Sequence, residues 1–174
     1  QTLPTKFTTS KSQFSLSNTD SQWQIGATAI GQGNTVISPI HAAMLVSAIA
    51  NGGTLMKPYV IDSVQSTEGS VIEQYESENY GTLMSASESS QLTKMMKAVV
   101  EEGTGYKLSG KNYSVAGKTG TAEVVGRGNN AWFVGFAPAD DPKIAICVLV
   151  EDAGTASSEA VPIAGEILDA YLNN

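Results

Sequence analysis

The feature that most constrains the fold is a run of three strand candidates near the C-terminal end. These candidates cover 114–125, 131–137 and 143–151, and the short turns 126–130 and 138–142 separate them. Connections this short join antiparallel neighbours, because a parallel crossover needs a dozen residues or more. The last strand is apolar throughout its centre, which is typical of a strand covered on both faces. The sequence therefore predicts an antiparallel sheet flanked by helices.

Two segments before the sheet carry clear helix signals. The first covers 40–50, with Ser38 as a predicted N-cap and Pro39 at the first helical position. In the second, Ser85 and Glu88 have the spacing of a capping box. Its apolar residues then recur at helical spacing on one face, which predicts that they face the core: Leu92, Met95, Met96, Val99 and Val100.

The remaining segments complete an α+β layout. Residues 159–172 predict a terminal helix, and 54–56, 59–65 and 71–75 predict short strands, with 68–70 as a turn. Helices packed on an antiparallel sheet define the α+β class.

We expect the whole chain to be part of one domain. In this division 1–24 is an irregular lead-in, 25–112 is a helical region with a small hairpin, and 113–174 is the three-strand sheet with its terminal helix.

Composition limits the possible functions. The chain has 174 residues, is 41% hydrophobic and carries a formal net charge of −7. Without a basic stripe, nucleic acid and anionic lipid are not expected partners. No apolar run approaches the roughly 20 residues that span a bilayer, so we expect this piece to be soluble. Because it begins with Gln1 rather than Met, we interpret it as part of a longer chain.

The segment 115–123 contains the residues best suited to chemistry. Strand alternation places Lys118 and Gly120 on one face, and Thr119 and Thr121 on the other. A lysine supplies positive charge, hydroxyls supply donors, and a glycine lets a ligand backbone lie close to the strand. This combination suits a peptide-like ligand that ends in a carboxylate. Taken alone, Lys-Thr-Gly is a weak tripeptide that recurs by chance, and an ordinary edge strand with a solvated lysine is then the more common explanation.

The surrounding blocks make the pattern more specific. Ser-x-x-Lys, Ser-Asp-Asn and Lys-Thr-Gly motifs together mark penicillin-binding proteins and class A β-lactamases. This chain resembles the class B penicillin-binding proteins in several blocks that occur in the family's order, from about Ile25 to the C-terminus. They are Ile-Gly-Gln-Gly at 30–33, the helix region 38–43 with 50–53, 99–105, Ala-Gly-Lys-Thr-Gly-Thr-Ala-Glu at 116–123, and Ala-Trp-Phe-Val-Gly-Phe-Ala-Pro-Ala at 131–139.

The resemblance implies an incomplete β-lactamase-like transpeptidase fold and a mechanism. In this family a serine attacks the D-Ala-D-Ala bond of a peptidoglycan stem, and a second stem's amine resolves the acyl-enzyme; β-lactams mimic the donor stem. By motif position, Lys118 is the catalytic lysine that holds the substrate carboxylate and shapes the proton network. Thr119, Gly120 and Thr121 bind substrate, and the backbone N–H of Thr121 is an oxyanion-hole donor. No cofactor is implied.

The chain departs from the family in lacking a nucleophile. Ser-x-x-Lys does not occur, and the nearest approach, 8–11, begins with threonine. Ser77 formally begins a Ser-x-Asn motif, but it follows the Ile-Gly-Gln-Gly block instead of preceding it, so we interpret it as a surface residue. We expect the serine before Gln1 and the chain alone to be inactive. By family topology 144–150 pairs with a strand from that missing part, so we expect the missing part, or self-association, to cover it.

The resemblance also implies a setting for the parent protein. It would be anchored to the cell membrane, with its catalytic domain on the extracytoplasmic face, and would work with the elongation or division machinery. A serine β-lactamase or D,D-carboxypeptidase fragment is an alternative, which the blocks at 30–33 and 132–138 disfavour. A non-catalytic β-lactam- or peptidoglycan-binding sensor is another, and an interaction domain with an incidental motif is a third.

Other reactive residue types have simpler interpretations. His41 has no evident partner in the sequence, and we expect it to be structural. Cys147 lies in an apolar strand and is expected to be core. Of Trp132 and Phe133, which point to opposite faces, one is expected in the core. No set of residues has metal-ligand spacing, so no metal site is predicted.

Overall fold

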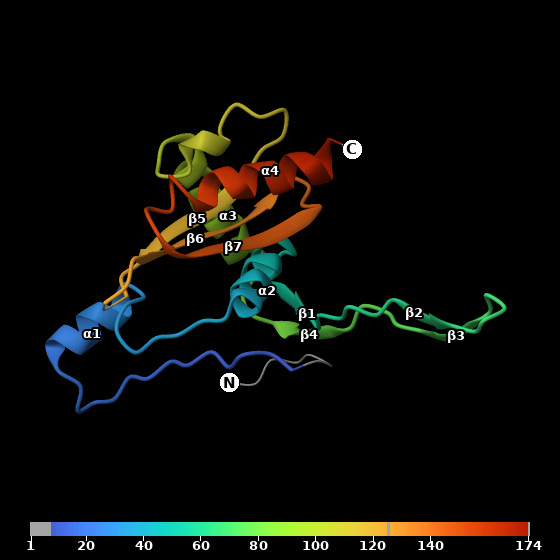
Figure 1. Ribbon diagram of the computed structural model, residues 1–174, viewed down its shortest axis with the longest axis horizontal. Helices are drawn as coiled ribbons and strands as arrows, with labels where there is room; N and C mark the ends of the chain where they lie inside the picture. The colour runs from blue at the N-terminus through green and yellow to red at the C-terminus, as the bar shows by residue number, and fades with distance from the viewer. Residues whose placement is uncertain (1–7, 125, 174) are drawn as a thin grey trace.

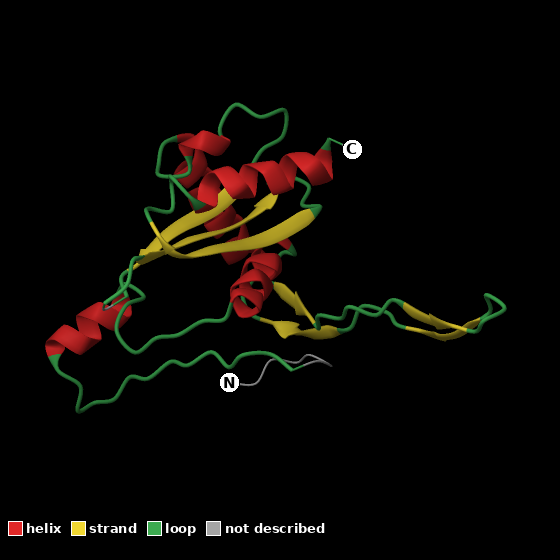
Figure 2. Cartoon of the chain, viewed as in Figure 1, coloured by secondary structure: helices red, strands yellow, loops and turns green. Residues whose placement is uncertain are grey.

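The computed structural model describes residues 8–124 and 126–173. Figure 2 shows helices packed around a central sheet, with two short strand pairs to one side. The helices are α1 Gln22–Ala29, α2 Pro39–Ala50, α3 Ala86–Glu101, the 3-10 turn η1 Tyr106–Leu108 and α4 Ala160–Leu172. The strands are β1 Thr54–Met56, β2 Ser63–Gln65, β3 Val71–Gln74, β4 Asn79–Thr82, β5 Ala116–Ala122, β6 Asn129–Ala137 and β7 Ile144–Ala153.

The central sheet confirms the predicted antiparallel meander. Its strand order is β5-β6-β7, and both neighbouring pairs are antiparallel. In this register Lys118 pairs with Val134, and Thr119 pairs with Phe133. Strand β5 begins two residues later than predicted and ends at Ala122, whereas β7 continues to Ala153. Val125, the last residue of the predicted strand, lies outside the described residues.

Helices cover both faces of the sheet, which confirms the α+β class. Helix α4 packs on β6 and β7, while α2 and α3 pack on the other face (Figure 1). On the α4 side the ring of Phe133 and the side chain of Leu168 are fully buried in the larger core cluster. A smaller cluster around Val46, Met96 and Phe136 fills the α2 and α3 side. The sheet is thus the middle of three layers.

Strand β7 is covered unequally. Ile146 and Val148 are buried against the α4 side, while Cys147 and Leu149 on the other face are only partly covered. The expectation of full burial on both faces is therefore correct for one face only. The physical reason is that α2 alone reaches β7 on the second face, and it does not extend over the whole strand.

The predicted helix caps are present. The Ser38 hydroxyl accepts a hydrogen bond from the backbone of His41, and Ser85 with Glu88 forms the capping box of α3. One part of the α3 prediction is wrong: Met96 is buried, but the side chain of Met95 is 58% exposed. Met95 borders an open groove. Helical spacing correctly identified the apolar face of α3, but it could not show that the edge of this face, where Met95 lies, is left uncovered by the described residues.

Helix α1 begins inside the segment 1–24, which was predicted to be irregular, and continues into the region predicted to be helical, where no separate helix was placed before residue 38. The side chain of Ser21 and that of Gln24 form a capping box, and the helix ends before Gly31, whose φ is +77°. None of its residues is buried. A helix without an apolar inner face gives no periodic signal, which explains the missed prediction. The first residues of the predicted lead-in, 1–7, lie outside the described residues.

The hairpin region contains two strand pairs instead of one. Strand β1 pairs with β4, which was not predicted, and β2 pairs with β3 around the predicted turn. Of the strand predicted over 59–65, only the residues of β2 have strand structure. Strand β4 reads Asn-Tyr-Gly-Thr, which lacks β-branched apolar residues and offers little strand signal. Figure 1 shows the β2–β3 pair extending far from the three-layer body.

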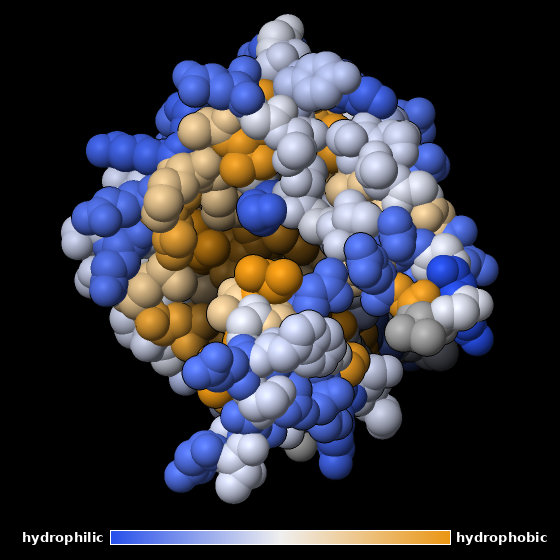
Figure 3. All heavy atoms as spheres, turned by 90° about the vertical axis from the view of Figure 1, so that its left-hand side faces the viewer, coloured by the Kyte–Doolittle hydropathy of each residue, from blue (hydrophilic) through white to orange (hydrophobic). Residues whose placement is uncertain are grey.

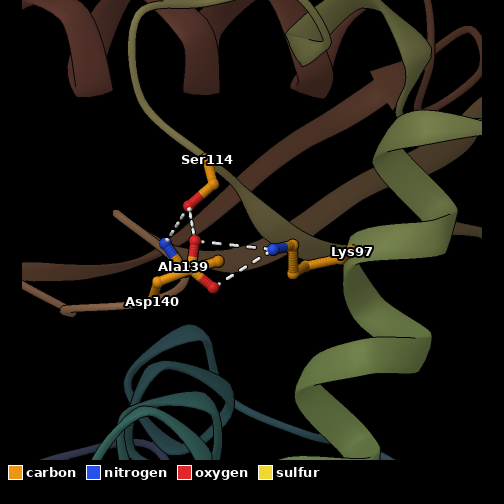
Figure 4. Close-up of polar contacts among 4 residues, drawn as sticks. All are labelled: Lys97, Ser114, Ala139 and Asp140. Carbon is orange, nitrogen blue, oxygen red and sulfur yellow. Dashed lines mark hydrogen bonds and ion pairs between the residues drawn. The ribbon is translucent and has the colours of Figure 1, made fainter.

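A polar cluster fastens the β6–β7 turn to its neighbours (Figure 4). The carboxylate of Asp140 accepts hydrogen bonds from Ser114 Oγ at 2.9 Å and from Lys97 Nζ at 3.1 Å. The backbone N–H of Ala139 donates to the Ser114 hydroxyl at 3.0 Å. These contacts join the turn to α3 and to the residues just before β5, so they hold β5 against the rest of the sheet.

Candidate functional site

An apolar groove lies beside the Lys-Thr-Gly strand. It opens between α2 and α3, has a volume of about 480 Å³, and reaches Lys118 of β5 and Val134 of β6. Figure 3, which faces the side of the molecule opposite the β2–β3 pair, shows a hollow lined by hydrophobic residues. The apolar side chains of the two helices line it: Ile37, Ala42, Leu45, Val46, Ile49, Leu92, Met95, Met96 and Val99. A positive charge thus lies at the edge of a mostly apolar hollow.

The side chain of Lys118 lies at the exposed edge of β5. Its Nζ donates to the carbonyl of Thr119 at 2.5 Å, and no carboxylate among the described residues forms an ion pair with it. Its charge is therefore not neutralised by a neighbouring acid. An ammonium group in such a position can attract an anionic ligand group.

Thr119 faces the opposite side of the strand, as the alternation predicted. Its side chain is buried, and its Oγ1 lies 2.5 Å from Oγ1 of Thr104, in the loop between α3 and η1. The structure therefore separates Lys118 from the Thr119 hydroxyl. This hydroxyl already has a partner inside the protein, which the sequence pattern could not reveal.

Thr121 is exposed at the open edge of β5. Its Oγ1 accepts a hydrogen bond from the backbone N–H of Ala156 at 3.2 Å, and its carbonyl accepts one from Gln32 Nε2 at 3.5 Å. In an antiparallel ladder the N–H and C=O of one residue point to the same edge. Because the Thr121 carbonyl points away from β6 toward Gln32, its N–H points to the open edge as well.

Glycines differ sharply in how closely they are packed. A Cβ on Gly117 would lie 2.3 Å from the Phe133 ring, and one on Gly135 would lie 2.6 Å from the carbonyl of Ala116. A Cβ on Gly120 would meet only Trp132 Cβ, at an ordinary 3.6 Å. The protein therefore requires glycine at 117 and 135, whereas the space over Gly120 is open to a ligand. Sequence reasoning singled out Gly120 and missed the other two.

His41 has a partner that the sequence did not predict. Its Nδ1 lies 2.7 Å from the hydroxyl of Ser12, which also accepts from the backbone N–H of Ser38 at 3.1 Å. This contact ties the extended lead-in to the start of α2, so the structural interpretation of His41 is supported by a named partner. This contact could not be predicted from the sequence because Ser12 lies 29 residues away from His41.

Cys147 and the acidic residues form no metal site among the described residues. Burial raises the pKa of the Cys147 thiol to about 11, which keeps it protonated at neutral pH. In the part of the chain that the structure describes, no helix is both long and apolar enough to cross a membrane.

The fold and its edge strand define the class. A three-layer α+β body that carries Lys-Thr-Gly on an edge strand beside an open groove is the arrangement implied by the resemblance to the β-lactamase-like transpeptidases. Residues 4–169 match the family model of the penicillin binding protein transpeptidase domain. The chain belongs to this family.

Individual relatives agree with this assignment. The peptidoglycan D,D-transpeptidase PbpA of Mycolicibacterium smegmatis is 34% identical over 85% of this chain, and MrdA of Haemophilus influenzae is 33% identical over 83%. A solved structure of penicillin-binding protein A from M. tuberculosis, an acyl-enzyme complex, superposes with a TM-score of 0.80 at 32% identity, covering 85% of this chain and 35% of that chain. These matches confirm the recognition of the class B family and the fold class. The chain spans about a third or less of these curated relatives.

Proposed function

We propose that this chain is the C-terminal portion of one D,D-transpeptidase domain in a class B penicillin-binding protein. Its part in the reaction would be to bind the stem peptide along the open edge of β5. The observation that carries this proposal is the edge itself: Lys118 and the backbone of Thr121 are both presented there, next to the groove. Relatives named as peptidoglycan D,D-transpeptidases support the same activity.

The substrate would lie as an extended segment beside β5. Its terminal carboxylate would pair with Lys118 and accept a hydrogen bond from the Thr121 hydroxyl. The outward-pointing N–H of Thr121 would donate to the carbonyl oxygen as it becomes an oxyanion. The open space over Gly120 allows the peptide backbone to approach closely. Because the Thr119 hydroxyl is bonded to Thr104, we assign Thr119 a supporting role unless substrate draws it outward.

The covalent step would use a serine outside this chain. Its oxygen would attack the penultimate carbonyl of D-Ala-D-Ala, the peptide bond would break, and D-alanine would leave with a proton. The amine of a second stem would then attack the acyl-enzyme and release the serine. A β-lactam would be opened in the same way but stay attached to the serine. The residues proposed to bind substrate and stabilise the oxyanion lie in this chain and the nucleophile does not, so the chain alone would be inactive.

The groove supports a proposal about the missing part of the domain. Leu45 and Met95 are exposed on its walls, and β7 has no partner on its outer edge among the described residues. Such surfaces are unfavourable in water and are normally covered. We propose that the preceding part of the same protein covers them and brings the serine next to Lys118. Without it, the chain would associate with itself.

We further propose that the parent works with the machinery of cell elongation or division. The name of one relative, stage V sporulation protein D, adds sporulation as a third candidate process. The parent would be anchored to the membrane with this domain outside. A solved relative is described as an imipenem acyl-enzyme complex at 33% identity, which supports β-lactam binding by the parent.

Labelling with a fluorescent penicillin tests the proposal. We expect the full-length parent to become covalently labelled and the 174-residue chain to remain unlabelled. In the parent, Lys118→Ala should slow labelling at least about tenfold, consistent with the loss of one charge-assisted contact, while Lys94→Ala on the exposed side of α3 should not. Labelling of the short chain would disprove the placement of the serine. An unlabelled but folded parent would favour the non-catalytic sensor.

A further inference from the structure

The β2–β3 pair, with its flanking residues 59–62 and 75–76, forms a ribbon that projects from the body (Figure 1). We call this segment, 59–76, the ribbon. Its apolar side chains lie in water: Val60 is 76% exposed and Ile72 is 68% exposed. Others on the ribbon are also classed as exposed: Tyr59, Ile61, Val64 and Val71.

The fold of the chain does not account for this exposure. A two-stranded ribbon is marginal in water unless a third strand or a packed layer supports it. All four residues of β3 are exposed, so no described element covers either of its faces. Apolar residues gathered on a projecting strand pair are typical of an interaction surface. The ribbon also presents open strand edges, to which an extended segment can add.

The negative charge of the ribbon indicates what kind of partner it would bind. Residues 59–76 contain four carboxylates and neither lysine nor arginine: Asp62, Glu68, Glu73 and Glu76. Pairing between two identical ribbons would bring like charges together, which disfavours a second copy. A segment with lysine or arginine between apolar residues would match both the charge and the apolar side chains.

The base of the ribbon offers a place for a basic side chain. A hollow of about 320 Å³ lies there, and Tyr59, Glu73, Tyr75 and Glu76 line it. Lys57 and Glu78 also line it, but they form an ion pair with each other, so the carboxylates of Glu73 and Glu76 leave the hollow with an excess of negative charge. Tyrosine faces and carboxylates both attract an ammonium or guanidinium group. The hollow would thus hold the segment at one end, while strand pairing would hold it along the ribbon.

The ribbon lies apart from the groove that the rest of the domain is proposed to cover, which favours a separate protein as the occupant. The groove that the rest of the transpeptidase domain is proposed to cover opens on the face shown in Figure 3, and the ribbon points away from that face. We propose that the ribbon docks a basic, extended segment of a partner protein, which pairs as an added strand. This surface is independent of the substrate strand β5.

A peptide of alternating lysine and valine, about eight residues long and carrying a fluorophore, tests the proposal with the full-length parent. We expect saturable binding by fluorescence polarisation, weakened as salt is raised. The same peptide with glutamate in place of lysine should bind at least about tenfold more weakly, because the charges then repel. A lysine–valine peptide interrupted by proline, which cannot pair as a strand, should also lose binding.

Paired variants locate the binding site. Glu73→Lys with Glu76→Lys should weaken binding of the lysine peptide about tenfold or more, and Ile72→Thr should weaken it while keeping a β-branched strand residue. The matched control is Glu101→Lys with Glu166→Lys, which changes the net charge equally on the exposed sides of α3 and α4. All variants should keep penicillin labelling, since the ribbon lies apart from β5.

Three results would overturn the proposal. One is no binding of the lysine peptide at millimolar concentration by a parent that is labelled by penicillin. A second is equal binding by the ribbon variants and the wild-type parent, which would place the peptide elsewhere. The third is self-association of the parent that disappears in the ribbon variants, which would identify a second copy as the occupant.

Discussion

Single residues of β5 divide between two environments. Lys118 lies at the groove, whereas Thr119 is buried against Thr104 on the other face, and Thr121 is exposed at the strand edge. The period of two in the sequence predicted this division correctly. It did not show which hydroxyl was already occupied, because Thr104 is 15 residues away and reaches β5 through the turn after α3.

The two threonines should therefore respond differently to truncation in the parent protein. Thr119→Ala removes the partner of a part-buried hydroxyl and should lower the free energy of unfolding by about 1–3 kcal/mol. Thr121→Ala removes an exposed side chain and its 3.2 Å hydrogen bond from the backbone N–H of Ala156, so it should slow penicillin labelling with a smaller loss of stability than Thr119→Ala. Urea unfolding and labelling rates measure the two effects. Equal destabilisation by both changes would contradict the structural distinction.

Cys147 should react slowly as long as the protein is folded. Its pKa of about 11 leaves far less thiolate at pH 8 than an ordinary cysteine has. Modification by a disulfide reagent should be on the order of a hundredfold slower than that of free cysteine, and its rate should continue to rise up to about pH 11. The same chain in denaturant is the control and should react at the ordinary rate. A rate that levels off near pH 8.5 would contradict the effect of burial on the pKa.

At the scale of elements, the turn that carries Asp140 connects β5, α3 and the β6–β7 hairpin. The hydrogen bond from Ser114, with a further one from Lys97, lowers the pKa of Asp140. A lowered folded-state pKa means that the contribution to stability is present above the unfolded pKa of about 3.9 and is lost as pH falls through the folded value. The stabilising contacts that Asp140 makes between the three elements therefore depend on pH.

Asp140→Asn in the parent should lower the melting temperature at pH 7. The difference from wild type should shrink as the pH falls through about 4 and below, where the wild-type carboxylate becomes protonated too. Asp141→Asn is the matched control, because Asp141 pairs with Lys143 on the exposed surface and such pairs contribute little. A difference that is constant from pH 7 to pH 3 would show that the charge of Asp140 is not responsible.

Elements with a buried apolar face were predictable, and the others were not. Helices α2 and α3 and the central sheet followed from caps, periodicity and short turns. Helix α1 and strand β4 escaped prediction because they bury almost nothing, so their sequences carry no apolar pattern. The motif located the candidate site, but the groove beside it arises from contacts between α2, α3 and β6 that no local pattern encodes.

At the scale of the whole molecule, the exposed apolar groove should cause the isolated chain to self-associate. We expect sedimentation experiments on the 174-residue chain to reveal concentration-dependent association. Leu45→Lys, on the groove wall, should reduce it, because a charge opposes burial of that wall. Leu83→Lys, an exposed leucine outside the groove, is the control and should leave association unchanged.

Leu45→Lys, which should reduce self-association of the isolated chain, should be harmful in the parent. If the missing part of the domain covers the groove, Leu45→Lys should destabilise the parent by about 2 kcal/mol or more and reduce penicillin labelling. A parent that tolerates the change as well as Leu83→Lys would show that the groove remains open to solvent in the complete protein.

The ring of Phe133 fills the space that side chains would occupy on Gly117 and Gly135, which face each other across β5 and β6. No single one of these positions can therefore accept a larger residue while Phe133 remains, and loss of the ring alone would leave a cavity in the core. Change here has an order: the ring must shrink before Gly117 can vary, and Gly135 stays fixed even then, because a Cβ there would lie 2.6 Å from the carbonyl oxygen of Ala116. The strand that presents Lys118 can therefore accept substitutions on its core-facing side only in a few orders.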